Sequence, residues 1–145
     1  MINFKTVLYE ELNAKQKENY NFQKVSGVLA DFGYTTLRLS DDWQGADFIA
    51  QPRDGLTFLK VQLKGRLTFA AKYRNKEIFI CFRENKYWYL VDHDALLTIA
   101  LEMTNIKNTD SWITGEAYSF PTIPKELSDE VSKYRIVEVP ATHKS

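Results

Sequence analysis

Residues 45–64 read GADFIAQPRDGLTFLKVQLK, and this stretch decides how the rest of the chain is interpreted. Two short apolar runs, 46–51 and 56–63, flank the tetrapeptide Pro52-Arg53-Asp54-Gly55. Proline followed two residues later by Asp-Gly is a strong turn signal. The stretch therefore predicts a β-hairpin.

The same hairpin carries three polar side chains in a chemically informative pattern. Side chains alternate along a strand, so Gln62 and Lys64 point to one face. The antiparallel neighbour can bring Asp47 beside them. A carboxylate, an amide oxygen and an ammonium at the ends of paired strands suit metal-dependent hydrolysis of a phosphodiester.

Charge is balanced overall but unevenly distributed. The chain has 19 basic and 19 acidic residues and a net charge of zero, which argues against a strong general affinity for nucleic acid. Four acidic residues crowd the segment just before a basic ribbon that has no acid: Asp41, Asp42, Asp47 and Asp54, then Lys60, Lys64, Arg66, Lys72, Arg74 and Lys76 in residues 56–76. This ribbon is either a track for a phosphate backbone or a solvated charged face.

Length and composition predict one domain over residues 1–145 with a core of its own. No apolar run approaches the roughly 20 residues that span a bilayer, and the first residues lack the apolar region of a secretion signal. Cys81 is the single cysteine, so no disulfide framework is possible. We expect a cytoplasmic protein without a membrane partner. Glycine-rich phosphate loops, zinc-type Cys/His spacings and Gly-x-Ser-x-Gly elbows do not occur.

The remaining pattern predicts an α+β fold. Apolar residues at steps of three and four indicate a long first helix that ends before Gly33. We expect helices at 6–32, 95–103 and from 124, and strands at 35–39, 46–51, 56–63, 77–82, 86–91 and 135–139, with 104–123 unassigned. One helix, a run of strands and then further helices predict a mixed β-sheet flanked by helices.

These residues resemble the PD-(D/E)xK nuclease superfamily, which includes restriction endonucleases and Holliday-junction resolvases. Asp47 matches the motif aspartate, Gln62 the second acidic or amide position, and Lys64 the lysine. The resemblance covers about residues 7–92. It implies a restriction-endonuclease-like core over about 7–103, followed by a C-terminal extension over 104–145.

Two positions depart from the family pattern. Ala46 replaces the proline, which shapes the backbone and ligates nothing. Gln62 replaces the commoner glutamate, and its amide oxygen brings no negative charge. A Gln-x-Lys site should therefore bind Mg²⁺ more weakly than a site with two carboxylates.

The resemblance implies a metal-dependent DNA endonuclease. Asp47, Gln62 and the Leu63 carbonyl would hold Mg²⁺ or Mn²⁺, and Lys64 would orient the attacking water or stabilise developing charge. A further ligand from the first helix would be Glu18 or Gln23. The helix could equally emerge into solvent before Phe22, leaving Glu18 without that role.

The implied partner is DNA, contacted by the basic ribbon residues Lys60, Arg66, Lys72, Arg74 and Lys76. The family also allows a homodimer that gives each strand its own site. The alternative function is a nuclease-fold protein with little or no catalysis, which binds nucleic acid or another protein. His93, between Asp92 and Asp94, is either a proton carrier or a structural histidine.

Overall fold

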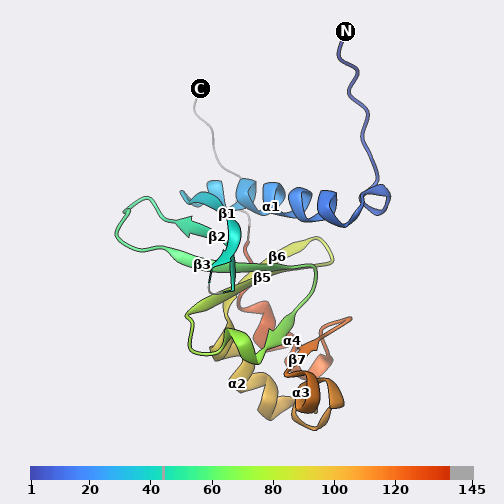
Figure 1. Cartoon of the computed structure of the whole chain (residues 1–145), viewed down its shortest axis with the longest axis vertical. Helices are drawn as coiled ribbons and strands as arrows, with labels where there is room; N and C mark the ends of the chain where they lie inside the picture. Colours follow the sequence, from blue (N-terminus) through green and yellow to red (C-terminus); the bar gives the residue numbers. More distant parts are fainter. Residues whose placement is uncertain (44, 138–145) are drawn as a thin grey trace.

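The computed structural model describes residues 1–43 and 45–137, without the side chains of residues 41–43. The side chains of Asp41 and Asp42 therefore lie outside the described residues. The elements, shown in Figure 1, are η1 (Tyr9–Glu11), α1 (Ala14–Ala30), β1 (Thr35–Trp43), β2 (Ala46–Gln51), β3 (Leu59–Lys64), β4 (Thr68–Ala70), η2 (Ala71–Tyr73), β5 (Ile78–Glu84), β6 (Tyr87–Asp92), α2 (His93–Met103), η3 (Ile106–Asn108), α3 (Asp110–Gly115), β7 (Ala117–Ser119) and α4 (Lys125–Ser132), where η marks a 3-10 helix.

Within the described residues, the main sheet has five strands in the order β1-β2-β3-β5-β6. The β3–β5 pair is parallel and the other neighbouring pairs are antiparallel. β4 and β7 form a separate antiparallel pair. Figure 1 shows α1 on one side of the main sheet and α2 and α4 on the other. The predicted α+β class, with a mixed sheet flanked by helices, is confirmed.

Helix α1 begins at Ala14, later than the predicted start near residue 6. Asn13 caps it, because the Asn13 side chain accepts from the Gln16 N–H and the Gln16 side chain accepts from the Asn13 N–H, both at 2.9 Å. This reciprocal box satisfies backbone donors that a helix start otherwise leaves unpaired. Gly33, at a φ of +82°, follows the helix as predicted.

The α1 side of the sheet has its own core. Val25 and Leu29 from α1 contact Phe48 and Val61 on the central hairpin, and Cys81 on β5 completes the cluster. Burying a valine, leucine or phenylalanine side chain stabilises the fold by roughly 1.5–3 kcal/mol each. The helical stripe read from the sequence is therefore what fixes α1 over β2 and β3.

A second core fills the other face. Ile80 and Phe82 on β5 pack with Leu96 from α2 and with Leu127 and Val131 from α4. The residues after 104 thus contribute to the same core as the central strands.

The central hairpin forms as predicted, except that β3 starts later. β2 pairs with β3 in the register Phe48↔Val61 and Ala50↔Leu59. β3 begins at Leu59 and not at Leu56 because residues 52–58 form the connection, in which Leu56 is 86% exposed. The site-bearing half of the hairpin is unaffected by this shift.

The elements after the hairpin differ from the predictions mainly at their ends. β5 runs on to Glu84 because Asn85, at a φ of +58°, makes the turn into β6. α2 starts at His93 because the Asp92 side chain accepts from the Ala95 N–H at 2.9 Å. Residues 104–123 contain η3, α3 and β7, which the sequence left unassigned.

The predicted last strand is seen only in part. Arg135 forms a single antiparallel bridge with Tyr89, and residues 138–139 of that strand lie outside the described residues. In the ranges 1–43 and 45–137, no helix has both the length and the apolar character to cross a membrane.

Candidate active site

Asp47 lies where the β2–β3 ladder ends. One residue beyond the Phe48↔Val61 pair, the register sets Asp47 opposite Gln62. Asp47 Oδ2 accepts the Leu63 backbone N–H at 2.8 Å. This bond fixes the carboxylate against β3, and a carboxylate has further lone pairs for other partners.

Gln62 is a largely buried amide. It is only 8% exposed, and Gln62 and His93 are the buried polar residues of the described chain. Burying an amide costs free energy unless its polar atoms are satisfied. Gln62 lines a cavity together with Asp47 and Lys64, so the amide is positioned where a ligand or water can satisfy it.

The three motif residues share one cavity of about 440 Å³, called here the Asp47 cavity. Its charged and amide lining residues come from α1, β1, β2 and β3: Lys15, Glu18, Asn21, Arg38, Asp47, Gln62 and Lys64. Lys64 also lies over the Tyr73 ring, with Nζ 6.0 Å from the centroid. The structure thus brings together the three side chains that the sequence predicts to converge.

The two candidate ligands on α1 are placed differently. Glu18 lines the Asp47 cavity at its rim, with a side chain 64% exposed, 3.5 Å from Lys15 Nζ and 4.0 Å from Arg38. Gln23 is exposed and does not line the cavity. Of the two, only Glu18 is within the site, and the Gln23 alternative is not supported.

Arg38 is a cavity residue that the sequence reading missed. It comes from β1, donates a hydrogen bond to the Asn19 side chain and lies over the Phe22 ring at 5.3 Å. Both contacts are with α1, so Arg38 is held at the rim of the cavity. No local pattern indicates this position, because it depends on how α1 crosses β1.

The donor set suits a hard cation. The N–H and C=O of one residue in an extended strand point to the same side, so the Leu63 carbonyl faces the Asp47 side of β3. Asp47, Gln62, Leu63 and Glu18 all offer oxygen atoms, which Mg²⁺ and Mn²⁺ prefer. Among the side chains that the structure describes, which exclude those of residues 41–43, no three His, Cys, Asp or Glu converge, so water would have to supply several ligand positions around a bound ion.

The basic ribbon does not form one continuous surface. Lys60 and Lys76 line a separate hollow that also holds Glu77, Asp92 and Asp94. Those acids offset the two lysines. The chain reverses through β4 and η2, which is why neighbouring cations are dispersed.

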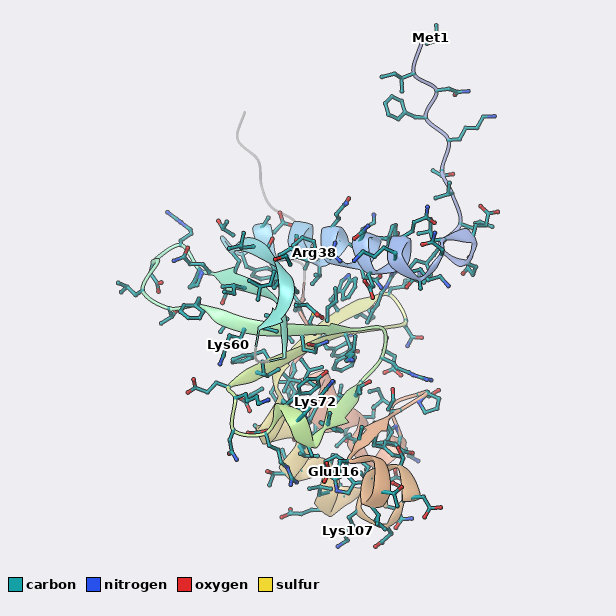
Figure 2. The ribbon with its side chains drawn as sticks, viewed as in Figure 1. Met1, Arg38, Lys60, Lys72, Lys107 and Glu116 are labelled. Atoms are coloured by element: carbon teal, nitrogen blue, oxygen red, sulfur yellow. The ribbon has the colours of Figure 1, made fainter. Side chains whose placement is uncertain are left out.

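Three further ribbon residues do not line the Asp47 cavity. Arg66 lines a third hollow beside Gly65, Lys72 lies over Tyr73 at 5.3 Å, and Arg74 lies over Trp112 at 5.3 Å. Figure 2 labels Lys60, on β3, and Lys72, in η2. Among the ribbon lysines and arginines, Lys64 is the one that lines the Asp47 cavity.

His93 is a structural residue and not part of this cavity. It is 1% exposed, and its Nε2 accepts the Ala70 N–H at 3.2 Å while Nδ1 lies 2.8 Å from Asp94 Oδ1. Accepting at Nε2 requires the neutral ring with the proton on Nδ1. Burial lowers the His93 pKa, although the Asp94 and Asp92 carboxylates act in the opposite direction. Of its two interpretations, the structural one is supported.

Comparison with known proteins gives two weak structural likenesses. One is to Hjc, a Holliday junction resolvase from the archaeal hyperthermophile Archaeoglobus fulgidus, with 15% identity, a TM-score of 0.39, and coverage of 48% of this chain and 74% of that chain. The other is to the bacterial homing endonuclease I-Ssp6803I, with 15% identity, a TM-score of 0.48, and coverage of 86% and 87% respectively. No family model and no curated protein sequence matches the chain. Its own residues therefore carry the functional interpretation.

Proposed function

We propose that the protein is a metal-dependent endonuclease of the PD-(D/E)xK type, in its Gln-x-Lys form, and that it hydrolyses phosphodiester bonds in DNA. The observation that carries the proposal is the convergence of Asp47, Gln62 and Lys64 on one cavity. A buried amide beside a carboxylate and an ammonium does not stabilise a hydrophobic core. The three groups together do, however, suit the binding of a cation and a phosphate.

Each of the site residues would have a definite part in this reaction. Asp47, fixed by the Leu63 N–H, would hold Mg²⁺ together with the Gln62 and Leu63 oxygens and solvent. The bound ion supplies charge neutralisation of the phosphate and lowers the pKa of a bound water. Lys64 orients the attacking water or stabilises the negative charge that develops on the phosphate oxygens. The water oxygen bonds to phosphorus as the ester bond to the leaving oxygen breaks.

The rim of the cavity supports phosphate binding. Arg38 and Lys15 bring two cations to the cavity that already contains Lys64. Glu18 reduces their combined charge, since it lies 3.5 Å from Lys15 Nζ. The acidic centre of such a site suits a metal cation, and its cationic rim suits an anionic substrate.

A catalytically silent nucleic-acid-binding module is the second candidate. Gln62 in place of a second carboxylate favours it, as does the lack of any three converging His, Cys, Asp or Glu side chains in the part of the chain that the structure describes. The endonuclease accounts better for Asp47, because a carboxylate facing a phosphate repels it unless a cation lies between them.

The test is cleavage of supercoiled, relaxed, branched and single-stranded DNA with Mg²⁺ or Mn²⁺. Asp47→Asn and Lys64→Met should each lower the rate by at least ~100-fold, the usual effect of removing a charge-stabilising group. Asp54→Asn is the matched control. Like Asp47, Asp54 accepts a backbone N–H, from Leu56 at 2.9 Å, but it lies in the hairpin turn and not in the Asp47 cavity.

The lysine control is Lys107→Met, which changes an exposed residue at the far end of the molecule from Arg38 (Figure 2). Both controls should cleave at the wild-type rate. Cleavage that persists in both site variants would show that the activity comes from elsewhere. Binding of DNA without cleavage in either metal would favour the silent module.

A further inference from the structure

A second cationic hollow adjoins the Asp47 cavity. It has a volume of about 330 Å³ and is lined by Gly65, Arg66, Arg83, Glu84, Asn85 and Thr122, among others. We call it the Arg83 cavity. Gly65 lines both cavities, so they meet at the residue between Lys64 and Arg66.

The Nε atom of Arg83 is a buried donor on a half-buried side chain. Among the described residues, this atom is the one buried side-chain nitrogen or oxygen with no hydrogen-bond partner. The guanidinium lies over the Trp88 ring, with Cζ 5.8 Å from the centroid. Stacking on an aromatic ring leaves the planar N–H donors available for an oxyanion. A buried donor without a partner is costly, which makes the side chain a candidate for ligand binding.

The one carboxylate of this cavity is held by the backbone. Glu84 Oε1 accepts the Ile123 backbone N–H at 2.9 Å. Arg66 is exposed and adds a second guanidinium. Two arginines and one engaged carboxylate leave the Arg83 cavity with a net positive charge, which favours an anion.

Gly65 leaves a gap between the two cavities. A Cβ built on Gly65 would meet no atom within 4 Å. The absence of a side chain there allows a ligand to pass close to the backbone. Lys64 and Arg66 are two residues apart, so their Cα atoms lie at most about 7 Å from each other. Successive phosphates of one strand span a comparable distance, because the backbone winds around the axis and separates them by more than the ~3.4 Å rise.

We propose that Arg83 and Arg66 bind a backbone phosphate of the same nucleic-acid strand whose neighbouring phosphate enters the Asp47 cavity. The strand passes over Gly65. This inference rests on the proposed function, since it takes nucleic acid as the substrate. It adds a second phosphate site and assigns Arg83, which lies outside the basic ribbon.

The experiment measures the salt dependence of binding, with no cleavage taking place. A fluorescent duplex is titrated by anisotropy in EDTA for the wild type, Arg83→Met, Arg66→Met and the matched control Arg53→Met. Arg53 is exposed and lies in the turn at the other end of β3. Loss of one phosphate contact lowers the slope of log K against log salt by about 0.9.

Arg83→Met and Arg66→Met should therefore each reduce the slope by about 0.9, so that their deficit in affinity shrinks by ~3–4-fold between 50 and 200 mM salt. Arg53→Met should leave the slope unchanged. Arg83→Lys, which keeps the charge, should restore most of it. Wild-type slopes for both Arg83→Met and Arg66→Met would overturn the inference and leave the nuclease proposal intact, provided that the wild type cleaves DNA.

Gly65→Leu gives a second, independent readout in case Arg83→Met fails to fold. Its side chain meets no protein atom near the Cβ, so the melting temperature should stay within ~2 °C of wild type. DNA affinity should nevertheless fall by about tenfold, equivalent to ~1.4 kcal/mol. Unchanged affinity would contradict the passage of a strand over Gly65. A wild type that binds no nucleic acid at any salt concentration would overturn both this inference and the proposed function.

Discussion

Replacing Gln62 with glutamate tests the geometry of the site without relying on catalysis. The new carboxylate has the length of the amide that it replaces, at a position only 8% exposed. The Asp47 carboxylate is 2.8 Å from the Leu63 nitrogen, one peptide unit from the Gln62 Cα. Asp47 and Gln62 face each other across β2 and β3, where facing Cβ atoms lie about 4.5–5.5 Å apart, so the two carboxylates would be at about that separation. At about 5 Å, like charges repel by ~3 kcal/mol at an effective dielectric constant of 20.

In EDTA at neutral pH, Gln62→Glu should lower the free energy of unfolding by about 2–3 kcal/mol, which shifts the melting temperature of a domain of this size down by roughly 5–10 °C. Acidification should remove the deficit, because protonation neutralises the new carboxylate. Saturating Mg²⁺ should also remove it, since the cation screens both charges. The wild type should respond to Mg²⁺ much less.

The measurement is a thermal melt with and without Mg²⁺, compared with Gln23→Glu. Gln23→Glu is the same chemical change on the exposed face of α1, so the melting temperature of this variant should differ from that of the wild type by less than ~2 °C in either condition. A Gln62→Glu protein that melts like the wild type in EDTA would refute the facing arrangement of Asp47 and Gln62.

Three further predictions follow from buried or strained residues away from the site. Burial lowers the His93 pKa below its ordinary value of 6.5, so the unfolded chain binds more protons than the native protein and the native state should lose stability as the pH falls below about 6.5. Urea unfolding at a series of pH values should show this loss in the wild type and not in His93→Gln. Gly45→Ala should lower the free energy of unfolding by ~2 kcal/mol, because Gly45 has a φ of +88° and a Cβ would lie 3.0 Å from the Tyr73 ring. The control Gly27→Ala has open space around its Cβ in α1 and should be neutral or stabilising when both variants are compared by thermal melts. The Cys81 thiol is fully buried and burial raises its pKa, so a thiol reagent should label it only at the rate of unfolding; rapid labelling under native conditions would contradict the packing around it.

Local chemistry made the central hairpin and its motif predictable. The Pro-Arg-Asp-Gly turn and the two-residue period determine that Gln62 and Lys64 share a face, and these signals lie within 20 residues. The apolar stripe of Phe22, Val25, Leu29 and Phe32 predicted the packed face of α1 for the same reason, except at Phe32, which follows the end of the helix and is 46% exposed. These features depend on neighbours in sequence.

Features that depend on long-range packing were not predictable in this way. Arg38 enters the site through the β1–α1 crossing, and its contacts with Asn19 and Phe22 link two separate elements. The basic ribbon looked continuous in sequence but divides among several hollows, because the chain turns between Lys64 and Ile78. The start of α1 is a different case, because the capping box of Asn13 and Gln16 is a local signal, three residues apart, that the apolar period alone does not indicate.

The most direct test of the central claim is where a cation binds. Crystals soaked in Mn²⁺ and measured at its absorption edge would locate the ion by anomalous scattering. We predict one peak within bonding reach, roughly 2.0–2.3 Å, of the Asp47 carboxylate and the Gln62 amide oxygen, close to the Leu63 carbonyl, and no such peak in Asp47→Asn. A peak that appears only in the hollow containing Asp92 and Asp94, or an Asp47 cavity that stays empty at saturating Mn²⁺, would contradict the account.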